Sequence, residues 1–99
     1  MQMDIKLDER GKKATFFIEK DGERLGELLF FKSAPSRMTI YHTEVNEKLR
    51  GTGAGNELIA AAFEYARKND LKIVPTCPYA RKVIERTPEF QEVLAEGEA

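Results

Sequence analysis

The amino-acid sequence predicts an α+β domain in which an antiparallel meander of four strands precedes a helix, a parallel fifth strand and a C-terminal helix. Three observations lead to this prediction. The first half alternates apolar and polar residues between short turn signals, the apolar period becomes helical after Gly55, and a short apolar run follows that helix. The chain has 99 residues, so we expect a single domain that spans residues 1–99.

The four strands of the meander are expected near residues 4–9, 13–20, 23–32 and 37–45. Glycine and proline turn signals separate these segments. The strongest of them is Asp21-Gly22, because a tight hairpin turn requires positive φ at its centre. The aromatic pairs Phe16-Phe17 and Phe30-Phe31 are expected to supply the core on one face and a covered sheet on the other.

The second half predicts one strand-helix-strand unit. A helix is expected from Gly55 to near Asn69, because apolar residues recur there at helical spacing, at Leu58, Ile59, Ala62, Phe63 and Ala66. Residues 71–75 form a short apolar strand. A crossover of this length makes parallel neighbours with a right-handed connection, so the fourth and fifth strands should lie side by side.

Prolines predict the end of that pairing and the elements that follow it. Pro75 donates no hydrogen bond, which allows the two parallel strands to part there. Pro78 suits the first position of a helix over residues 78–87, and Thr87-Pro88 ends this helix. A last amphipathic turn is expected to contain Phe90, Val93 and Leu94.

Composition excludes several classes of function. Sixteen basic and seventeen acidic residues give a net charge of -1, which makes nucleic acid an unexpected partner. Apolar runs such as Leu28 to Phe31 are far too short to span a membrane. The first ten residues lack the apolar stretch of a signal peptide, so a cytoplasmic location is expected. A single cysteine and a single histidine exclude an internal disulfide and a zinc cluster, so no metal is expected and any cofactor should be organic.

A glycine-rich segment, Leu49-Arg50-Gly51-Thr52-Gly53-Ala54-Gly55, joins the fourth strand to the helix. Backbone N–H groups in such a loop, together with the helix N-terminus, form an anion site, and Arg50 can add a charge-assisted contact. The alternative is that the glycines only make a loop and start a helix. A Walker loop is excluded because no Gly-Lys-Ser/Thr follows, and a Rossmann fingerprint would need glycine in place of Asn56.

The pattern that remains is Arg50-x-x-Gly53-x-Gly55, with Val45 before it and an apolar helix after it. This pattern resembles motif A of the GNAT superfamily of N-acetyltransferases, whose backbone amides hold the pyrophosphate of acetyl-CoA. The predicted order of elements is also similar to the GNAT order over nearly the whole chain. The resemblance implies acetyl-CoA as co-substrate and a set of cofactor-binding residues, namely Val45, Leu49, Arg50, Gly51, Thr52, Gly53, Ala54 and Gly55.

Two further segments narrow and qualify this resemblance. Pro75-Thr76-Cys77-Pro78-Tyr79, with Thr87-Pro88-Glu89-Phe90 after it, resembles the small single-domain YjdJ-type subfamily of GNAT-like proteins. Most GNATs have two helices between their first two strands, whereas the segment from Asp8 to Lys13 has room only for a turn. Those helices commonly wall the acceptor site. The acceptor is therefore not carried over, and the active site should be unusually open.

His42 is the leading candidate for a general base, because it lies in the fourth strand and imidazole exchanges protons near neutral pH. Strict alternation places it on the face of Met38, Ile40 and Glu44. A structural histidine satisfied by hydrogen bonds is the alternative. Glu44 could orient the imidazole or activate a water, or be a solvated side chain at a strand end.

Cys77 and Tyr79 are the other candidate catalytic residues. Cys77 lies just before Pro78, so it should cap the helix, where the helix dipole favours a thiolate. The parting strands would direct it toward the same cleft as His42, unless it is a small buried apolar group. The resemblance implies that Tyr79 protonates the departing CoA thiolate, and a core tyrosine is the alternative.

Three functional hypotheses remain from the sequence. The first is an N-acetyltransferase that moves acetyl from acetyl-CoA to an amine, either a small molecule or a protein, and acts as a monomer or weak homodimer. The second is a non-catalytic CoA-binding regulatory module, which the missing acceptor-site helices favour. The third, an interaction domain with no ligand, requires the glycine loop to be accidental.

Overall fold

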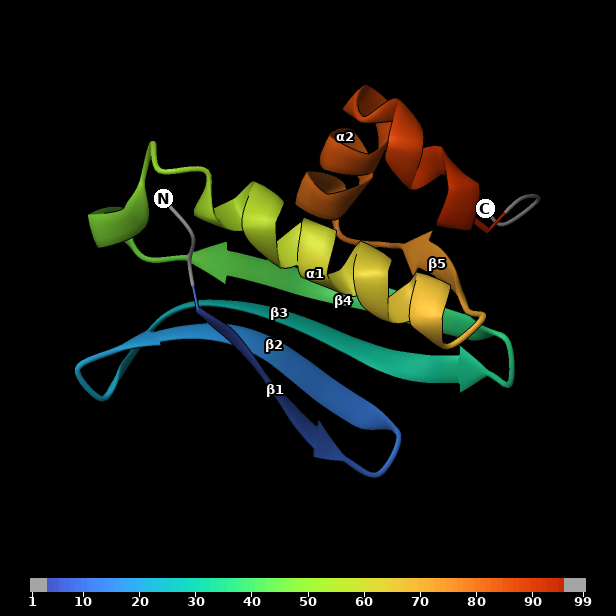
Figure 1. Ribbon diagram of the computed structural model, residues 1–99, viewed down its shortest axis with the longest axis horizontal. Helices are drawn as coiled ribbons and strands as arrows, with labels where there is room; N and C mark the ends of the chain where they lie inside the picture. The colour runs from blue at the N-terminus through green and yellow to red at the C-terminus, as the bar shows by residue number, and fades with distance from the viewer. Residues whose placement is uncertain (1–3, 96–99) are drawn as a thin grey trace.

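A five-stranded sheet in the order β1-β2-β3-β4-β5 is the frame of the protein, and a computed structural model describes residues 4–95 (Figure 1). Both ends of the predicted domain, residues 1–3 and 96–99, lie outside the described residues. The elements are β1 (Ile5–Arg10), β2 (Lys13–Lys20), β3 (Glu23–Ala34), β4 (Arg37–Val45), η1 (Glu47–Leu49), α1 (Ala54–Lys68), β5 (Lys72–Pro75), α2 (Pro78–Arg86) and η2 (Pro88–Val93). The predicted α+β fold is confirmed, with boundaries displaced by one or two residues.

Strands β1 to β4 form the predicted antiparallel meander, and β4 pairs with β5 in parallel. The β2–β3 turn has Asp21 at φ 52° and Gly22 at φ 80°, which confirms the expected positive φ at its centre. Three irregularities interrupt the pairing: one after Ile18, one between Leu29 and Phe30, and one between Lys32 and Ala34. The second irregularity decides the direction of the side chains in the later half of β4.

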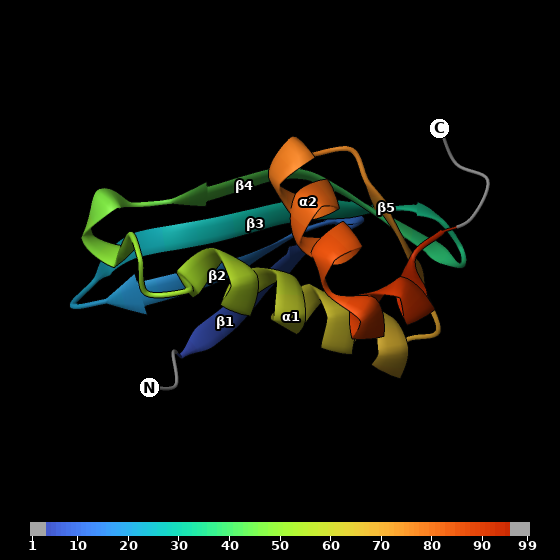
Figure 2. The same ribbon diagram turned by 90° about the horizontal axis from the view of Figure 1, so that it is seen from above.

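The hydrophobic core lies between the sheet and α1. Both α1 and α2 cover the same face of the sheet, as Figure 1 and Figure 2 show. The apolar stripe of α1 faces the sheet, so Leu58 and Ile59 are fully buried together with Leu28 and Phe30 of β3. Burial of each such side chain stabilises the fold by roughly 1.5–3 kcal/mol before conformational entropy is counted. This packing holds α1 against the sheet.

The opposite face of the sheet carries no helix among residues 4–95 (Figure 2). The sequence predicts a covered sheet there, and the cover over Phe17 comes from a side chain of the sheet itself. The guanidinium of Arg24 lies 3.8 Å from the centroid of the Phe17 ring, and Phe17 is only 9% exposed. The Phe31 and Tyr41 rings lie 5.7 Å apart on the same face. We call this surface the outer face of the sheet.

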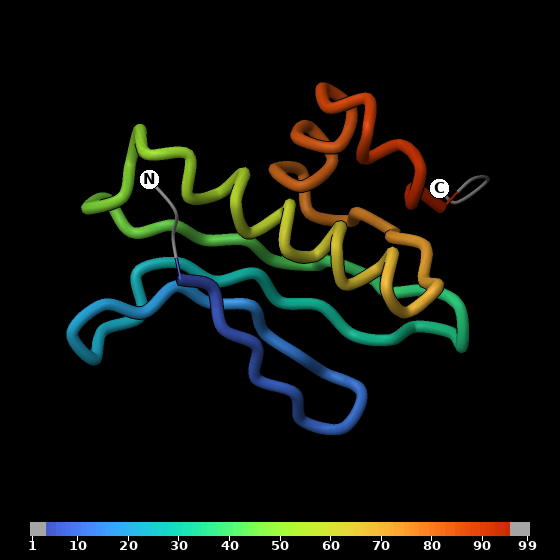
Figure 3. Tube along the Cα trace, in the orientation of Figure 1, coloured from blue at the N-terminus to red at the C-terminus, as the bar shows by residue number. Residues whose placement is uncertain are grey.

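The C-terminal part of the chain returns to β5 (Figure 3). Leu94 forms a parallel bridge with Ile73, and the N–H of Ala95 donates to the carbonyl of Ile73 at 2.9 Å. Phe90 packs on Phe63 of α1, with ring centroids 4.8 Å apart. Among the described residues, neither helix has the length and apolar character that crossing a membrane demands.

Candidate functional site

The parallel pairing of β4 and β5 ends early and leaves part of β4 as a free edge. The paired residues are Arg37–Ile40 and Lys72–Pro75. The carbonyl of Ile40 then accepts the N–H groups of Thr76 and Cys77, at 3.0 and 3.2 Å, before the chain enters α2. In the described chain, the β4 residues after Ile40 have no β5 partner (Figure 2). The strands therefore part at Pro75, as the sequence predicts.

A β-bulge at Tyr41 changes which face the following side chains occupy. Phe30 pairs with Ile40, whereas the preceding residue of β3, Leu29, pairs with His42. Residues that oppose each other across an antiparallel pair point to the same face, so His42 shares the outer face with Leu29. The expectation that His42 shares the face of Ile40 is wrong, because strict alternation does not survive the bulge.

The glycine loop has the backbone conformation that glycine favours. Gly51 and Gly53 have φ values of 80° and 84°, and a Cβ atom at either position would meet nothing within 4 Å. Gly53 is the N-cap of α1, and the first helical bond runs from the N–H of Glu57 to its carbonyl at 3.0 Å. The N–H groups of the first turn precede that bond and have no acceptor within the helix. The loop thus offers backbone donors beside open space.

A groove of about 340 Å³ lies between this loop, β4 and α2. Its lining includes seven of the eight predicted cofactor-binding residues, together with Tyr79 and Thr43. Thr52 is the eighth, and it does not line the groove: its N–H and its hydroxyl both donate to the carbonyl of Leu49. The residues that line the groove are Thr43, Val45, Leu49, Arg50, Gly51, Gly53, Ala54, Gly55 and Tyr79.

Tyr79 reaches the groove from the start of α2, and Cys77 lies just before this helix. Tyr79 is 40% exposed, so it is not a core residue, and its hydroxyl donates to Oδ1 of Asn56 at 3.3 Å. Cys77 is the N-cap residue of α2, as predicted, and its side chain makes no capping hydrogen bond. Cys77 is 8% exposed, and its thiol contacts the hydroxyl of Thr43, with an Sγ–Oγ1 distance of 3.7 Å. Cys77 therefore lies at the inner side of β4, next to the groove.

His42 lies on the other side of the sheet from this thiol. Thr43 pairs with Leu28, whose side chain belongs to the core under α1. Cys77 touches Thr43 on that face, and His42 belongs to the outer face. The sequence predicts one cleft shared by Cys77 and His42. The two side chains instead stand on opposite sides of β4, because the bulge redirects one of them.

On the outer face, His42 belongs to a polar cluster with two glutamates. Its Nε2 lies 3.4 Å from Oε1 of Glu44, and one ligand atom from each of Glu27, His42 and Glu44 lies within 4.8 Å of the others. The side chains of His42 and Glu44 are 47% and 70% exposed. A guanidinium nitrogen of Arg24 lies 4.0 Å from Glu27. These groups could accept a proton or hold a cation.

Comparison with known proteins identifies the family. The model of the GCN5-related N-acetyl-transferase family matches residues 15–93. The chain belongs to this family. A GCN5-like protein from Staphylococcus aureus, solved in solution, is 31% identical, with a TM-score of 0.74 over 97% of this chain and 91% of that one. Protein NATD1 of Gallus gallus is 28% identical over 85% of this chain and 77% of its own length.

A solved structure at lower identity shares only the fold with this GCN5-related chain. The acetyltransferase of Bacillus subtilis, determined in complex with CoA, is 17% identical, with a TM-score of 0.68 over 86% of this chain and 74% of that one. Within the described residues, β1 and β2 are joined by a two-residue turn at Gly11–Lys12 and no helix intervenes. The predicted departure from the usual GNAT order is thus present in the structure.

Sequence reasoning does not find three residues that the structure places at the groove or beside a candidate residue: Thr43, Asn56 and Glu27. Thr43 lines the groove and touches Cys77, but an isolated threonine in a strand carries no chemical signal. Asn56 carries no signal in the sequence beyond the absence of glycine, because its contact with Tyr79 joins residues 23 positions apart. Glu27 was missed because its approach to His42 depends on the register of β3 and β4.

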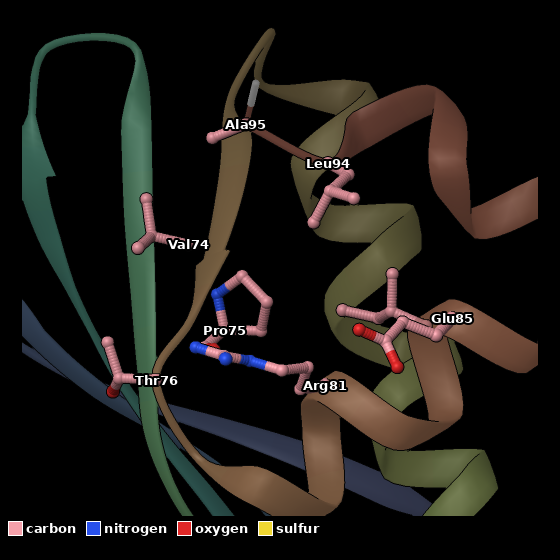
Figure 4. Close-up of a pocket in the computed structure, with 8 residues that line it drawn as sticks. Val74, Pro75, Thr76, Arg81, Glu85, Leu94 and Ala95 are labelled. Atoms are coloured by element: carbon pink, nitrogen blue, oxygen red, sulfur yellow. The ribbon is translucent and has the colours of Figure 1, made fainter. Parts of the chain in front are cut away.

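A second hollow, of about 230 Å³, contains none of the predicted site residues (Figure 4). It lies between β5, α2 and the returning C-terminal segment. The guanidinium of Arg81 donates to the carbonyl of Pro75, at 3.3 and 3.4 Å from its two nitrogens. Arg81 thereby satisfies the last carbonyl of β5, and we interpret this hollow as structural.

Proposed function

We propose that the protein binds acetyl-CoA in the groove and transfers the acetyl group to an amine. The observation that carries this proposal is the position of the groove. One end is formed by backbone donors of the glycine loop, and the other end reaches Thr43, which touches the Cys77 thiol beside the free edge of β4. An elongated ligand with an anionic end and a reactive end matches this arrangement.

The anionic end of the co-substrate fits the loop on chemical grounds. Backbone N–H groups at the N-terminus of α1, with the positive end of the helix dipole, stabilise a pyrophosphate. Arg50 is exposed and lines the groove, where it supplies a positive charge. The groove volume of about 340 Å³ falls in the range of small-molecule sites, roughly 300–1,000 Å³. The complex of the similar Bacillus subtilis acetyltransferase with CoA supports the same ligand.

The proposed reaction is a direct transfer. A neutral amine attacks the thioester carbonyl, a C–N bond forms, and the C–S bond then breaks. Backbone N–H groups on the free edge of β4 stabilise the oxyanion of the tetrahedral intermediate. The amine loses its proton to His42, which Glu44 orients at 3.4 Å, and the CoA thiolate receives a proton from Tyr79. The acceptor approaches from the outer face, where His42 lies, and the thioester lies on the groove side.

Mass spectrometry after incubation with labelled acetyl-CoA tests this function. The protein is incubated alone and with a panel of small amines and lysine-containing peptides. Transfer of label to an amine, faster than in a reaction without protein, is the expected result. Binding of CoA without transfer to any amine would contradict the enzymatic part of the proposal.

A CoA-binding regulatory module is the second candidate function. It is favoured by the two-residue connection between β1 and β2, since helices that wall an acceptor site in other GNATs have no counterpart there. Binding of CoA that alters association with another protein, without acetyl transfer, would support it. Under either function, we expect a monomer or weak homodimer in the cytoplasm, where a lone cysteine stays reduced.

A further inference from the structure

Tyr79 crosses from the first turn of α2 to the first turn of α1, and two residues of α1 receive it. Its hydroxyl donates to Oδ1 of Asn56 at 3.3 Å. Its ring lies against Gly55: a Cβ atom at Gly55 would be 2.7 Å from Cζ and 2.9 Å from Cε2 of the tyrosine. Real Cβ atoms essentially never approach carbon so closely, so any side chain at Gly55 would displace Tyr79.

The reason for glycine at position 55 therefore differs from the reason at position 53. Gly53 has a φ of 84°, with open space where a Cβ would stand. Gly55 lies within α1 and is absent from the residues with positive φ, so its backbone does not require glycine. The requirement comes from the tyrosine ring. We call Gly55 and Asn56 the tyrosine seat, in which one residue gives room and the other gives a hydrogen bond.

The tyrosine seat affects the groove only through Tyr79. Tyr79 lines the groove, and Asn56, an exposed residue of α1, does not. Tyr79 lines the same groove as the glycine loop and Thr43, so its ring is a wall for a ligand that contacts both. A ring held at two points keeps that path narrow, and a narrow path lowers the entropy cost of ordering a flexible ligand arm.

We propose that Asn56 is a positioning residue that holds Tyr79 as the wall along which the pantetheine arm of CoA runs. This inference rests on the proposed function and adds a residue to it. Asn56 is not assigned a contact with the phosphates or the thioester, and it acts on the ligand only through the Tyr79 hydroxyl. Asn56 raises the affinity for CoA only through the pantetheine arm. This effect is absent when residue 79 has no hydroxyl group to donate to Asn56.

Four variants and two ligands test this inference by isothermal titration calorimetry. The variants are Asn56→Ala, Tyr79→Phe, their double mutant and the control Asn69→Ala. Asn69 is an asparagine at the other end of α1, whose Nδ2 donates to the carbonyl of Tyr65 at 2.8 Å. The ligands are CoA and adenosine 3′,5′-bisphosphate, which keeps the nucleotide end and lacks the pantetheine arm.

We expect Asn56→Ala and Tyr79→Phe each to weaken CoA binding about three- to tenfold, the range of one net hydrogen bond. The double mutant should lose no more CoA affinity than the single mutant with the larger loss, because both substitutions remove the same hydrogen bond. Binding of the bisphosphate should stay within about twofold of the parent in every variant. The control Asn69→Ala should bind both ligands as the parent does.

Additive effects of the two substitutions, or equal losses for both ligands in Asn56→Ala, would overturn the inference. CoA affinity that is unchanged in Asn56→Ala would overturn it as well. If the parent binds the bisphosphate and CoA equally tightly, the arm gains nothing from Tyr79, and the inference fails while the proposed phosphate site stands. If the parent binds neither ligand, the proposed function fails together with it.

Discussion

Gly53 is the residue at which the backbone itself makes the proposed phosphate site. It combines a φ of 84° with open space on the side where a Cβ would stand. A β-branched side chain there is strained, since positive φ is unfavourable for such residues. It would also occupy the space that we assign to the pyrophosphate. A side chain at this position thus opposes both the conformation and the ligand.

We predict that Gly53→Val abolishes measurable CoA binding while the protein remains folded. Gly22→Val is the matched control, because Gly22 has a φ of 80° with nothing within 4 Å and lies in the β2–β3 turn. Both variants should lose roughly 1–3 kcal/mol of stability through backbone strain. Only Gly53→Val should lose affinity by calorimetry. Equal CoA affinity in a folded Gly53→Val variant would contradict the assignment of the loop.

Arg50 contributes a positive charge to the groove, whereas the glycine loop contributes the arrangement of backbone donors. It is exposed, so its attraction for a phosphate is screened by salt, whereas the arrangement of the backbone donors is not. We predict that Arg50→Ala weakens CoA binding less than Gly53→Val, and that the deficit shrinks as salt is raised. Titrations at low and high ionic strength measure this deficit. A loss as large as that of Gly53→Val at both salt concentrations would argue against this role.

Cys77 distinguishes two chemical routes. In direct transfer, the amine attacks acetyl-CoA, so Cys77→Ala should lower the rate only partly and no acetyl-cysteine should form. In the alternative, a thiolate takes the acetyl group first and passes it to the amine. The position of His42 on the outer face removes it as the base for Cys77, which favours direct transfer.

Peptide mapping after brief mixing with labelled acetyl-CoA tests the prediction for Cys77. Digestion at mildly acidic pH preserves thioesters. We expect the peptide that contains Cys77 to remain unlabelled, and Cys77→Ser serves as the control for label on other residues. Label on this peptide that an amine then removes would establish the covalent route instead.

At the scale of elements, α1 ends in a Schellman motif that uses aspartate where glycine is common. The N–H of Leu71 donates to the carbonyl of Ala66 at 2.8 Å, and that of Asp70 reaches the carbonyl of Arg67 at 3.5 Å. Asp70 has a φ of 54°, which aspartate tolerates and glycine adopts without strain. Leu71 is 5% exposed, so the motif also buries an apolar side chain.

We predict that Asp70→Gly raises the free energy of unfolding by up to about 1 kcal/mol, because the left-handed conformation no longer strains the backbone. Denaturant unfolding followed by circular dichroism measures the change. Asp70→Ala is the control, since alanine removes the carboxylate and keeps the strain, and it should not be stabilising. If both substitutions stabilise the protein equally, removal of the charge and not of the strain is responsible.

The strands and helices could be predicted from the sequence, because residues nearby in the sequence determine where each of them begins and ends. Asp21-Gly22 marks a hairpin through its own φ preference, and Pro75 ends the parallel pairing because it has no N–H. The bulge at Tyr41 carries no comparable signal, since it depends on which residue of β3 stands opposite. The loop residues of the groove lie close together in the sequence and could be predicted. The partners of Tyr79 and His42 on other elements could not.

At the scale of the molecule, the sheet separates two chemical environments. The glycine loop, Tyr79 and Cys77 lie on the side covered by α1 and α2, and His42 and Glu44 lie on the outer face. The free edge of β4 after Ile40 connects the two sides. The proposed co-substrate and the proposed acceptor therefore meet at one edge while they occupy opposite faces. Substitutions on the groove side should then affect the kinetics with acetyl-CoA, and substitutions on the outer face should affect the kinetics with the amine.

We predict that Glu44→Gln raises KM for the amine acceptor, or lowers kcat, and leaves KM for acetyl-CoA unchanged. The carboxylate lies 3.4 Å from the His42 ring, so its neutral replacement removes both the orienting charge and the attraction for a cationic amine. Glu64→Gln is the matched control, because Glu64 is an exposed glutamate of α1 that pairs only weakly, at 3.8 Å, with Arg67.

The measurement is a pair of steady-state titrations, one with each substrate varied. The proteins compared are the parent, Glu44→Gln, its control Glu64→Gln, His42→Gln and Arg50→Ala. Arg50→Ala should raise KM for acetyl-CoA and spare that for the amine, whereas the two substitutions on the outer face should show the reverse pattern. A loss of about two orders of magnitude in kcat/KM for the amine is expected for His42→Gln, which is the lower limit of the contribution of a general base. Unchanged amine kinetics in both outer-face variants would place the acceptor on the same side as the co-substrate, because a base on the opposite face would then have no part in the reaction.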